Sequence, residues 1–139
     1  MAITFINKHT DLSIPETIKT SSWMKECIRE EAFLLGKLQY TFLNDEDLHK
    51  INVDFLNHDT YTDVITFDYN RNNIVFGEIY ISLDRIQENA QQNNTTFQNE
   101  WHRIVIHGLL HLLGYKDKSV EEKMLMTSKE DYYLSLQPQ

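Results

Sequence analysis

The sequence contains a single cysteine among its 139 residues, so the chain cannot form an internal disulfide. It also contains no apolar run that approaches the length of about eighteen residues needed to span a membrane. The N-terminus lacks the basic and then apolar order of a signal peptide. These absences predict a soluble cytoplasmic protein, in which the lone Cys27 packs in the core of an amphipathic helix.

Basic residues are in deficit. Thirteen lysines and arginines face 21 acidic residues, for a formal net charge of −8. Affinity for nucleic-acid phosphates depends largely on lysine and arginine, so this composition argues against a non-specific nucleic-acid binder. RNA binding would require a local cluster of basic groups, such as Arg103, Lys116 and Lys118, or a protein partner that delivers the substrate.

Internal repeats and low-complexity tracts are also absent, and the length fits one domain, residues 1–139, with its own core. Hydrophobic periodicity predicts strands over 3–6, 37–43, 64–67 and 74–82, the last two paired in a hairpin. It predicts helices over 16–35, 45–56, 84–92 and 97–113, with a final helix beyond residue 120. Gly36 is expected to end the first helix. The pattern indicates an α+β domain with a mixed sheet of about four strands flanked by helices.

The helix predicted near the C-terminus carries a metal-binding pattern. His107 and His111 are one helical turn apart and project from the same face. Gly114 can adopt the left-handed conformation that ends a helix and turns the chain back, which places Asp117 as a third ligand. Three protein ligands with a fourth position open are typical of a catalytic zinc site.

The remaining histidines are weaker candidates. His102 lies five residues before His107, about 140° around the helix, so we expect it to face elsewhere. His9, His49 and His58 are interpreted as surface residues, with a phosphate contact by His58 as a less favoured alternative.

Two segments resemble a known family. Residues 107–117, His-Gly-Leu-Leu-His-Leu-Leu-Gly-Tyr-Lys-Asp, are similar to the signature of the YbeY family of bacterial metal-dependent endoribonucleases. Residues 62–67, Thr-Asp-Val-Ile-Thr-Phe, match a second family block, and Gly77-Glu78-Ile79 stands where the family has Gly-Asp-Ile. The chain departs from the family at Asp117, where a histidine is usual, and at Lys116, where an aspartate is usual. It also has no arginine between Asn57 and Thr62.

The resemblance implies a zinc-dependent endoribonuclease specific for single-stranded RNA. Its implied role is late maturation of small-subunit ribosomal RNA and ribosome quality control, with the small subunit or its assembly proteins as partners. A carboxylate at Asp117 makes the site harder and more anionic, which leaves another transition metal possible. The catalytic residues stay unassigned, but Asp63 or Glu78 could orient the attacking water or the second ring nitrogen of a ligand.

Five aromatic residues could stack RNA bases, although such residues more often pack in a core or on a sheet surface. The candidates are Tyr40, Tyr61, Phe67, Tyr69 and Tyr80.

Two other functions fit the pattern. The ligand spacing also matches that of metal-dependent peptidases and amidohydrolases, but Gly108 stands where these enzymes carry a glutamate base. A third possibility is a non-catalytic ribosome-assembly factor, in which the metal only fixes the last helix to the following loop.

Overall fold

The computed structural model describes residues 2–57 and 62–137 of the chain. Helices and strands follow one another in the order β1 (Ala2–Asn7), α1 (Ile18–Glu30), β2 (Leu34–Leu43), α2 (Asp45–Leu56), β3 (Val64–Asp68), β4 (Ile74–Ser82), α3 (Leu83–Gln92), α4 (Phe97–Leu112) and α5 (Val120–Ser135). Within these residues, no helix combines the length and apolarity that crossing a lipid bilayer requires.

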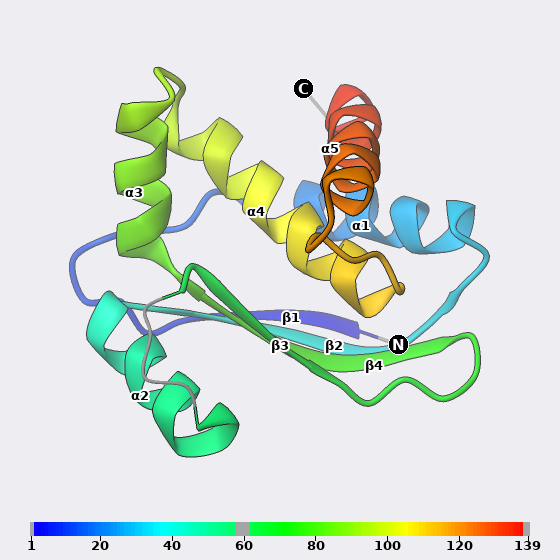
Figure 1. Ribbon diagram of the computed structural model, residues 1–139, viewed down its shortest axis with the longest axis horizontal. Helices are drawn as coiled ribbons and strands as arrows, with labels where there is room; N and C mark the ends of the chain where they lie inside the picture. The colour runs from blue at the N-terminus through cyan, green and yellow to red at the C-terminus, as the bar shows by residue number, and fades with distance from the viewer. Residues whose placement is uncertain (1, 58–61, 138–139) are drawn as a thin grey trace.

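The four strands form one mixed sheet in the order β1-β2-β4-β3. Strands β1, β2 and β4 are parallel, and β3 pairs with β4 as an antiparallel hairpin. This arrangement confirms the predicted α+β class, the four-stranded mixed sheet and the hairpin. Figure 1 shows α1, α4 and α5 on one side of the sheet and α2 on the other.

The two faces of the sheet differ in how much they are covered. Side chains alternate along β4, and a Cβ added at Gly77 would lie 2.7 Å from Leu112 of α4, so the odd-numbered β4 residues face the helical layer. The even-numbered residues, Phe76, Glu78 and Tyr80, face the opposite side. There, α2 packs only over one end, through the small cluster of Leu48 with Ile65.

The main core lies between the sheet and helices α1, α4 and α5. Two buried polar groups in it are paired with backbone: Tyr40 Oη donates to the Val105 carbonyl (2.7 Å), and Trp23 Nε1 donates to the Tyr133 carbonyl (2.7 Å). Cys27 is 1 % exposed, which confirms that it packs in the core.

The predicted first helix was too long. It ends at Glu30 rather than at residue 35, and Gly36 lies inside β2 instead of terminating a helix. Ala32 adopts a left-handed conformation (φ 66°), and the Phe33 amide donates back to the Ile28 carbonyl (3.0 Å). This turn directs Phe33 toward the core, which explains why the apolar spacing continued past the true end of the helix.

The final helix is present as predicted, but most of the apolar residues that indicated it are exposed. Ser119 and Glu122 form a capping box that fixes its start. Its buried positions are Met126, Glu130 and Tyr133, which share one face of the helix.

Candidate metal site

Helix α4 carries the two histidines of the site. His107 and His111 lie one turn apart, and their rings meet at 86° with centroids 4.6 Å apart. Their Nε2 atoms are 3.1 Å from each other. The buried residues of α4, such as Leu109 and Leu110, pack in the core and therefore fix the orientation of the histidine face.

The chain returns to this face through a tight helix end. Gly114 has φ +103°, as the sequence predicted. The Tyr115 amide donates to Leu110 (3.0 Å) and the Gly114 amide to His111 (3.1 Å), which is a Schellman motif. Asp117 Oδ2 then lies 3.4 Å from the Nε2 atom of His107 and 3.3 Å from that of His111.

These three donor atoms fit one tetrahedral metal ion. Bonds of about 2.0–2.2 Å at tetrahedral angles place ligand atoms about 3.3–3.6 Å apart. The observed sides of the triangle are 3.1, 3.3 and 3.4 Å, and His107, His111 and Asp117 form a group that could hold a metal ion. The side chain of Asp117 is 39 % exposed, so the site opens to solvent on that side.

The second nitrogen of each ring has an oxygen partner. His107 Nδ1 donates to Glu130 Oε2 (2.6 Å), and His111 Nδ1 donates to the Tyr115 carbonyl (3.0 Å). A neutral imidazole with its proton on Nδ1 has a lone pair on Nε2. Both Nε2 atoms therefore point toward Asp117 as potential ligands, with their tautomers fixed by the neighbouring oxygens.

Glu130 was not identified from the sequence. It is 7 % exposed and lies on α5, where its second oxygen accepts from Arg103 of α4 (2.8 Å). Arg103 also binds Asp131 (2.7 Å), so α4 and α5 are joined beside the site. The available signal was the spacing of Met126, Glu130 and Tyr133, which places a carboxylate within an apolar stripe of α5.

Negative charge surrounds His107. Burial lowers the pKa of His107, but the hydrogen bond and charge of Glu130 outweigh it, with smaller contributions from Asp63 and Asp117, so that the pKa is raised. Asp63 directly precedes Val64 of β3, which would lie 3.6 Å from a Cβ added at Gly108, the residue after His107. Burial, together with the charge of Asp63 and Glu130, also raises the pKa of Glu100 on α4, against the opposing effect of Arg103.

The structure separates the two candidate catalytic carboxylates. The charge of Asp63 acts on His107, whereas strand alternation places Glu78 on the opposite face of the sheet, where it accepts from Tyr80 Oη (3.1 Å). The expectation that Asp63 or Glu78 orients a ligand's second ring nitrogen is corrected, because Glu130 occupies that position for His107 and the Tyr115 carbonyl for His111.

The interpretation of His9 as a surface residue was wrong, because its side chain is 7 % exposed and its Nε2 atom lies 2.8 Å from Asp84 Oδ1. His102 is buried against Trp23 and Trp101 and faces away from the site, as expected. Tyr40 is in the core, while Phe67 and Tyr80 pack beside α2. His58 and Tyr61 lie outside the described residues.

Of the expected basic cluster, Arg103 is ion-paired with Glu130 and Asp131 and is not free for phosphate. Lys116 and Lys118 lie in the loop that carries Asp117, between α4 and α5.

A four-stranded mixed sheet, with a helix and a following loop that bring together three side chains able to hold a metal ion, defines the class of this α+β protein. A family model described as Endoribonuclease YbeY matches residues 4–137. The chain therefore belongs to the YbeY family, which confirms the resemblance found in the sequence.

Individual relatives agree with this assignment. The chain is 42 % identical to Endoribonuclease YbeY of Flavobacterium johnsoniae over 94 % of each chain. It is 36 % identical to Endoribonuclease YbeY of Bacteroides fragilis over the full length of both. The solution structure of TM1509 from Thermotoga maritima superposes with a TM-score of 0.69 at 26 % identity, covering 96 % of this chain and 87 % of that one.

Proposed function

We propose that this protein is a metal-dependent endoribonuclease and that residues 1–139 form one YbeY-like catalytic domain. The observation that carries the proposal is the triangle of His107 Nε2, His111 Nε2 and Asp117 Oδ2, with sides of 3.1–3.4 Å, in a chain of this family. Zn²⁺ is the proposed ion, and the Asp117 carboxylate also suits a harder transition metal.

The chain's own groups prepare the site for such an ion. Glu130 and the Tyr115 carbonyl hold the protons on the Nδ1 atoms of His107 and His111, which leaves the Nε2 lone pairs free. Asp117 contributes one negative charge at the solvent-exposed side. When bound, the ion would supply Lewis-acid stabilisation of charge on the scissile phosphate and make water a stronger acid.

Asp63 is the proposed proton acceptor for the attacking water. Three carboxylates act on His107 by their charge: Glu130, Asp63 and Asp117. Asp117 is a proposed ligand and Glu130 is hydrogen-bonded to the ring, which leaves Asp63 for this role. Its backbone is held by the Ser82 amide, which donates to the Asp63 carbonyl (3.1 Å) and so fixes the start of β3. General-base catalysis requires such a group within hydrogen-bond reach of the water.

The proposed substrate is single-stranded RNA. Following the family, the cellular role is late maturation of small-subunit ribosomal RNA and ribosome quality control, in the cytoplasm, with ribosomal RNA and the small subunit or its assembly proteins as partners. The net charge of −8 favours delivery by such a partner over unaided binding along RNA.

The packing around Gly108 argues against a peptidase or amidohydrolase. A Cβ added at Gly108 would lie 3.0 Å from Ile79 Cγ2 and 3.6 Å from Val64 Cγ2. The glutamate that zinc peptidases carry at this position would therefore point into the sheet instead of toward the ligands.

The test compares the wild type with Asp117→Asn and His111→Ala. Each is incubated with a single-stranded RNA and, separately, with an unstructured peptide. Bound metal is measured by inductively coupled plasma mass spectrometry. Asp68→Asn is the matched control, because Asp68 is an exposed carboxylate on β3 outside the metal group. We expect RNA cleavage by the wild type and Asp68→Asn, and loss of both metal and cleavage in the other two.

The alternatives give different results. Peptide cleavage that depends on His111 would support a peptidase. Bound metal without any cleavage, together with a lower melting temperature for His111→Ala, would support a non-catalytic assembly factor. A wild type that binds no transition metal would contradict all three.

A further inference from the structure

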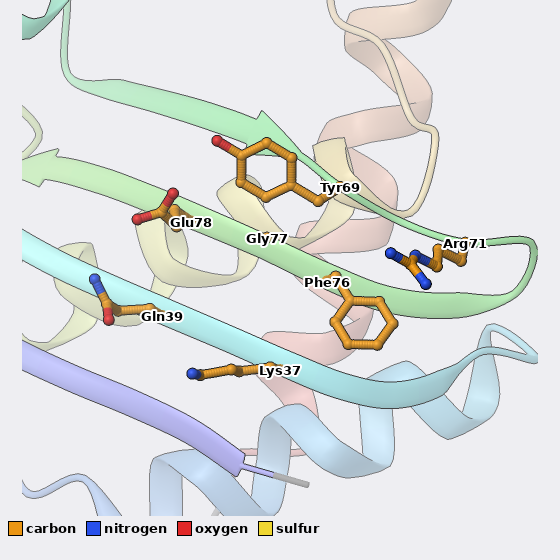
Figure 2. Close-up of a pocket in the computed structure, with 7 residues that line it drawn as sticks. All are labelled: Lys37, Gln39, Tyr69, Arg71, Phe76, Gly77 and Glu78. Carbon is orange, nitrogen blue, oxygen red and sulfur yellow. The ribbon is translucent and has the colours of Figure 1, made fainter.

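The face of the sheet opposite the metal-binding helix carries a cavity of about 440 Å³. This volume lies in the range of small-molecule sites, about 300–1,000 Å³. Figure 2 shows its lining side chains, which come from β2, β4 and the β3–β4 turn and project from the sheet: Lys37, Gln39, Tyr69, Arg71, Phe76 and Glu78.

The strand register brings these residues together. Lys37 of β2 is paired with Phe76 of β4, and Gln39 with Glu78 in the next row. The Tyr69 amide donates to the Phe76 carbonyl (2.8 Å), which places Tyr69 beside Phe76 on the other flank. One row therefore presents a cation and two aromatic rings, and the next presents an amide and a carboxylate.

The Phe76 ring lies against the backbone of Gly36. A Cβ added at Gly36 would lie 2.6 Å from two atoms of this ring, so the ring rests directly on the Gly36 backbone. Gly36 is where the β2–β4 register shifts between Leu35 and Lys37. The glycine that was expected to end a helix thus provides a flat support for an aromatic ring on the open sheet face.

Arg71 has no carboxylate partner in the described part of the chain. The other three arginines each form ion pairs: Arg29 with Glu26, Arg85 with Asp45 and Glu88, and Arg103 with Glu130 and Asp131. Lys37 likewise forms no ion pair among residues 2–57 and 62–137. In a chain of net charge −8, two cations that form no ion pair among the described residues and lie beside aromatic rings complement an anionic ligand that also has a flat ring.

We propose that this cavity binds an unpaired nucleotide of the RNA substrate. The base stacks on Tyr69 and Phe76, its edge meets Gln39 and Glu78, and its phosphate binds Arg71 and Lys37. Four-stranded sheets bind single-stranded RNA in this way in other folds, through aromatic residues on an open face.

The β3–β4 turn, which lines the cavity, also contacts the end of α4. Asn70 lies between Tyr69 and Arg71, and its Nδ2 atom donates to the Leu112 carbonyl at the end of α4 (2.7 Å). The same side chain accepts from the Phe76 amide (2.8 Å). The β3–β4 turn therefore joins the cavity to the helix that carries the metal ligands. This inference rests on the proposed function.

The experiment measures binding separately from cleavage. All proteins carry His111→Ala, and the probe is a fluorescein-labelled single-stranded oligoribonucleotide of mixed sequence, followed by fluorescence anisotropy over a range of salt concentrations. Tyr69→Ala, Tyr69→Phe and Arg71→Ala are compared with the parent. Tyr132→Ala and Arg29→Ala are matched controls, because they remove an exposed tyrosine and an exposed arginine from other surfaces.

Stacking on an aromatic side chain predicts that Tyr69→Ala weakens binding about tenfold, while Tyr69→Phe retains it. The slope of log affinity against log salt is negative. Loss of one phosphate contact predicts that Arg71→Ala reduces the magnitude of this slope by about 0.7. The controls should match the parent.

Unchanged affinity and slope in both variants, or no RNA binding by the parent, would overturn the nucleotide site. A failure of the proposed function has a different signature, namely no RNA cleavage by the protein with His111 intact, whatever the binding data show.

Discussion

At the scale of single residues, the partner of each ring nitrogen determines how a histidine can bind a metal. Glu130 is the only carboxylate within hydrogen-bond distance of His107 Nδ1 among the described residues, and Arg103 holds its other oxygen. A buried carboxylate in this position sets the tautomer and orientation of the ring. Glu130 is therefore a positioning residue for His107, a proposed metal ligand.

Replacing Glu130 should weaken metal binding. We expect Glu130→Ala to lower metal affinity about 10–100-fold, because the ring of His107 loses its orienting acceptor. Glu130→Gln should retain much of the affinity, since its amide oxygen can still accept from Nδ1. Competition with a chromogenic chelator measures this, with Glu121→Ala as the exposed α5 control. Equal affinities for the wild type and Glu130→Ala would show that Glu130 does not act on the ligand.

A second residue prediction concerns the choice of metal. Asp117→His replaces a hard oxygen with an imidazole, so we expect tighter binding of Zn²⁺ relative to Mn²⁺. Parallel titrations of both ions against wild type and variant give the ratio. Asp68→His, outside the metal group, should leave the ratio unchanged. If Asp117→His also leaves it unchanged, residue 117 is not a ligand.

The cluster of His107, His111 and Asp117 could be predicted from the sequence because its three residues are local. His107 and His111 share a helix, and Gly114 returns Asp117 within one short turn. Glu130 could not be predicted in the same way, because its contact with His107 depends on how α5 docks against α4. The placement of Glu78 likewise required the register of β4, which the motif itself does not contain.

At the scale of elements, residues with positive φ end several helices, and two of these ends lead to predictions. Ala32 after α1 and Gly114 after α4 both have positive φ, 66° and 103°. Sequence reasoning identified Gly114 and missed Ala32. An alanine gives no local signal for this conformation. The end of α1 is instead set by pairing of Leu34 with Ile74, forty residues away.

These two positions predict opposite changes in stability. Gly114→Ala should lower the free energy of unfolding by about 1–2 kcal/mol, because its Cβ meets nothing within 4 Å and only the backbone conformation is strained. Ala32→Gly should raise it by about 0.5–1 kcal/mol, because a strained alanine is relieved. Urea denaturation of both variants measures the difference. The same sign for both would contradict this account of the helix ends.

At the scale of the whole molecule, Glu31 connects α1, the metal loop and α5. Its carboxylate accepts from Tyr115 Oη (2.6 Å), from Lys129 Nζ (3.1 Å) and from Tyr133 Oη. Burial raises the pKa of Glu31, but these hydrogen bonds outweigh it, so the pKa is lowered. The ionised carboxylate therefore stabilises the folded chain and holds Tyr115, whose carbonyl orients His111.

The lowered pKa predicts a dependence of stability on pH. The contribution of Glu31 is fully present above its unfolded pKa, about 4.3, and is lost as the pH falls through the lower folded value. Glu31→Gln should thus be less stable than the wild type at pH 7, with a difference that shrinks below about pH 4. Urea unfolding across this range tests it. Glu26→Gln on the exposed face of α1 is the control, and a constant difference for Glu31→Gln would refute the assignment.

The proposed metal site and the proposed activity both require one cation held by three side chains. The most direct measurement is anomalous X-ray diffraction at the zinc edge from crystals grown with Zn²⁺. We predict a single strong peak about 2.0–2.2 Å from His107 Nε2, His111 Nε2 and a carboxylate oxygen of Asp117, with the Nδ1 atoms still bonded to Glu130 and the Tyr115 carbonyl. No peak between the rings, or an Asp117 side chain turned away from it, would contradict the account.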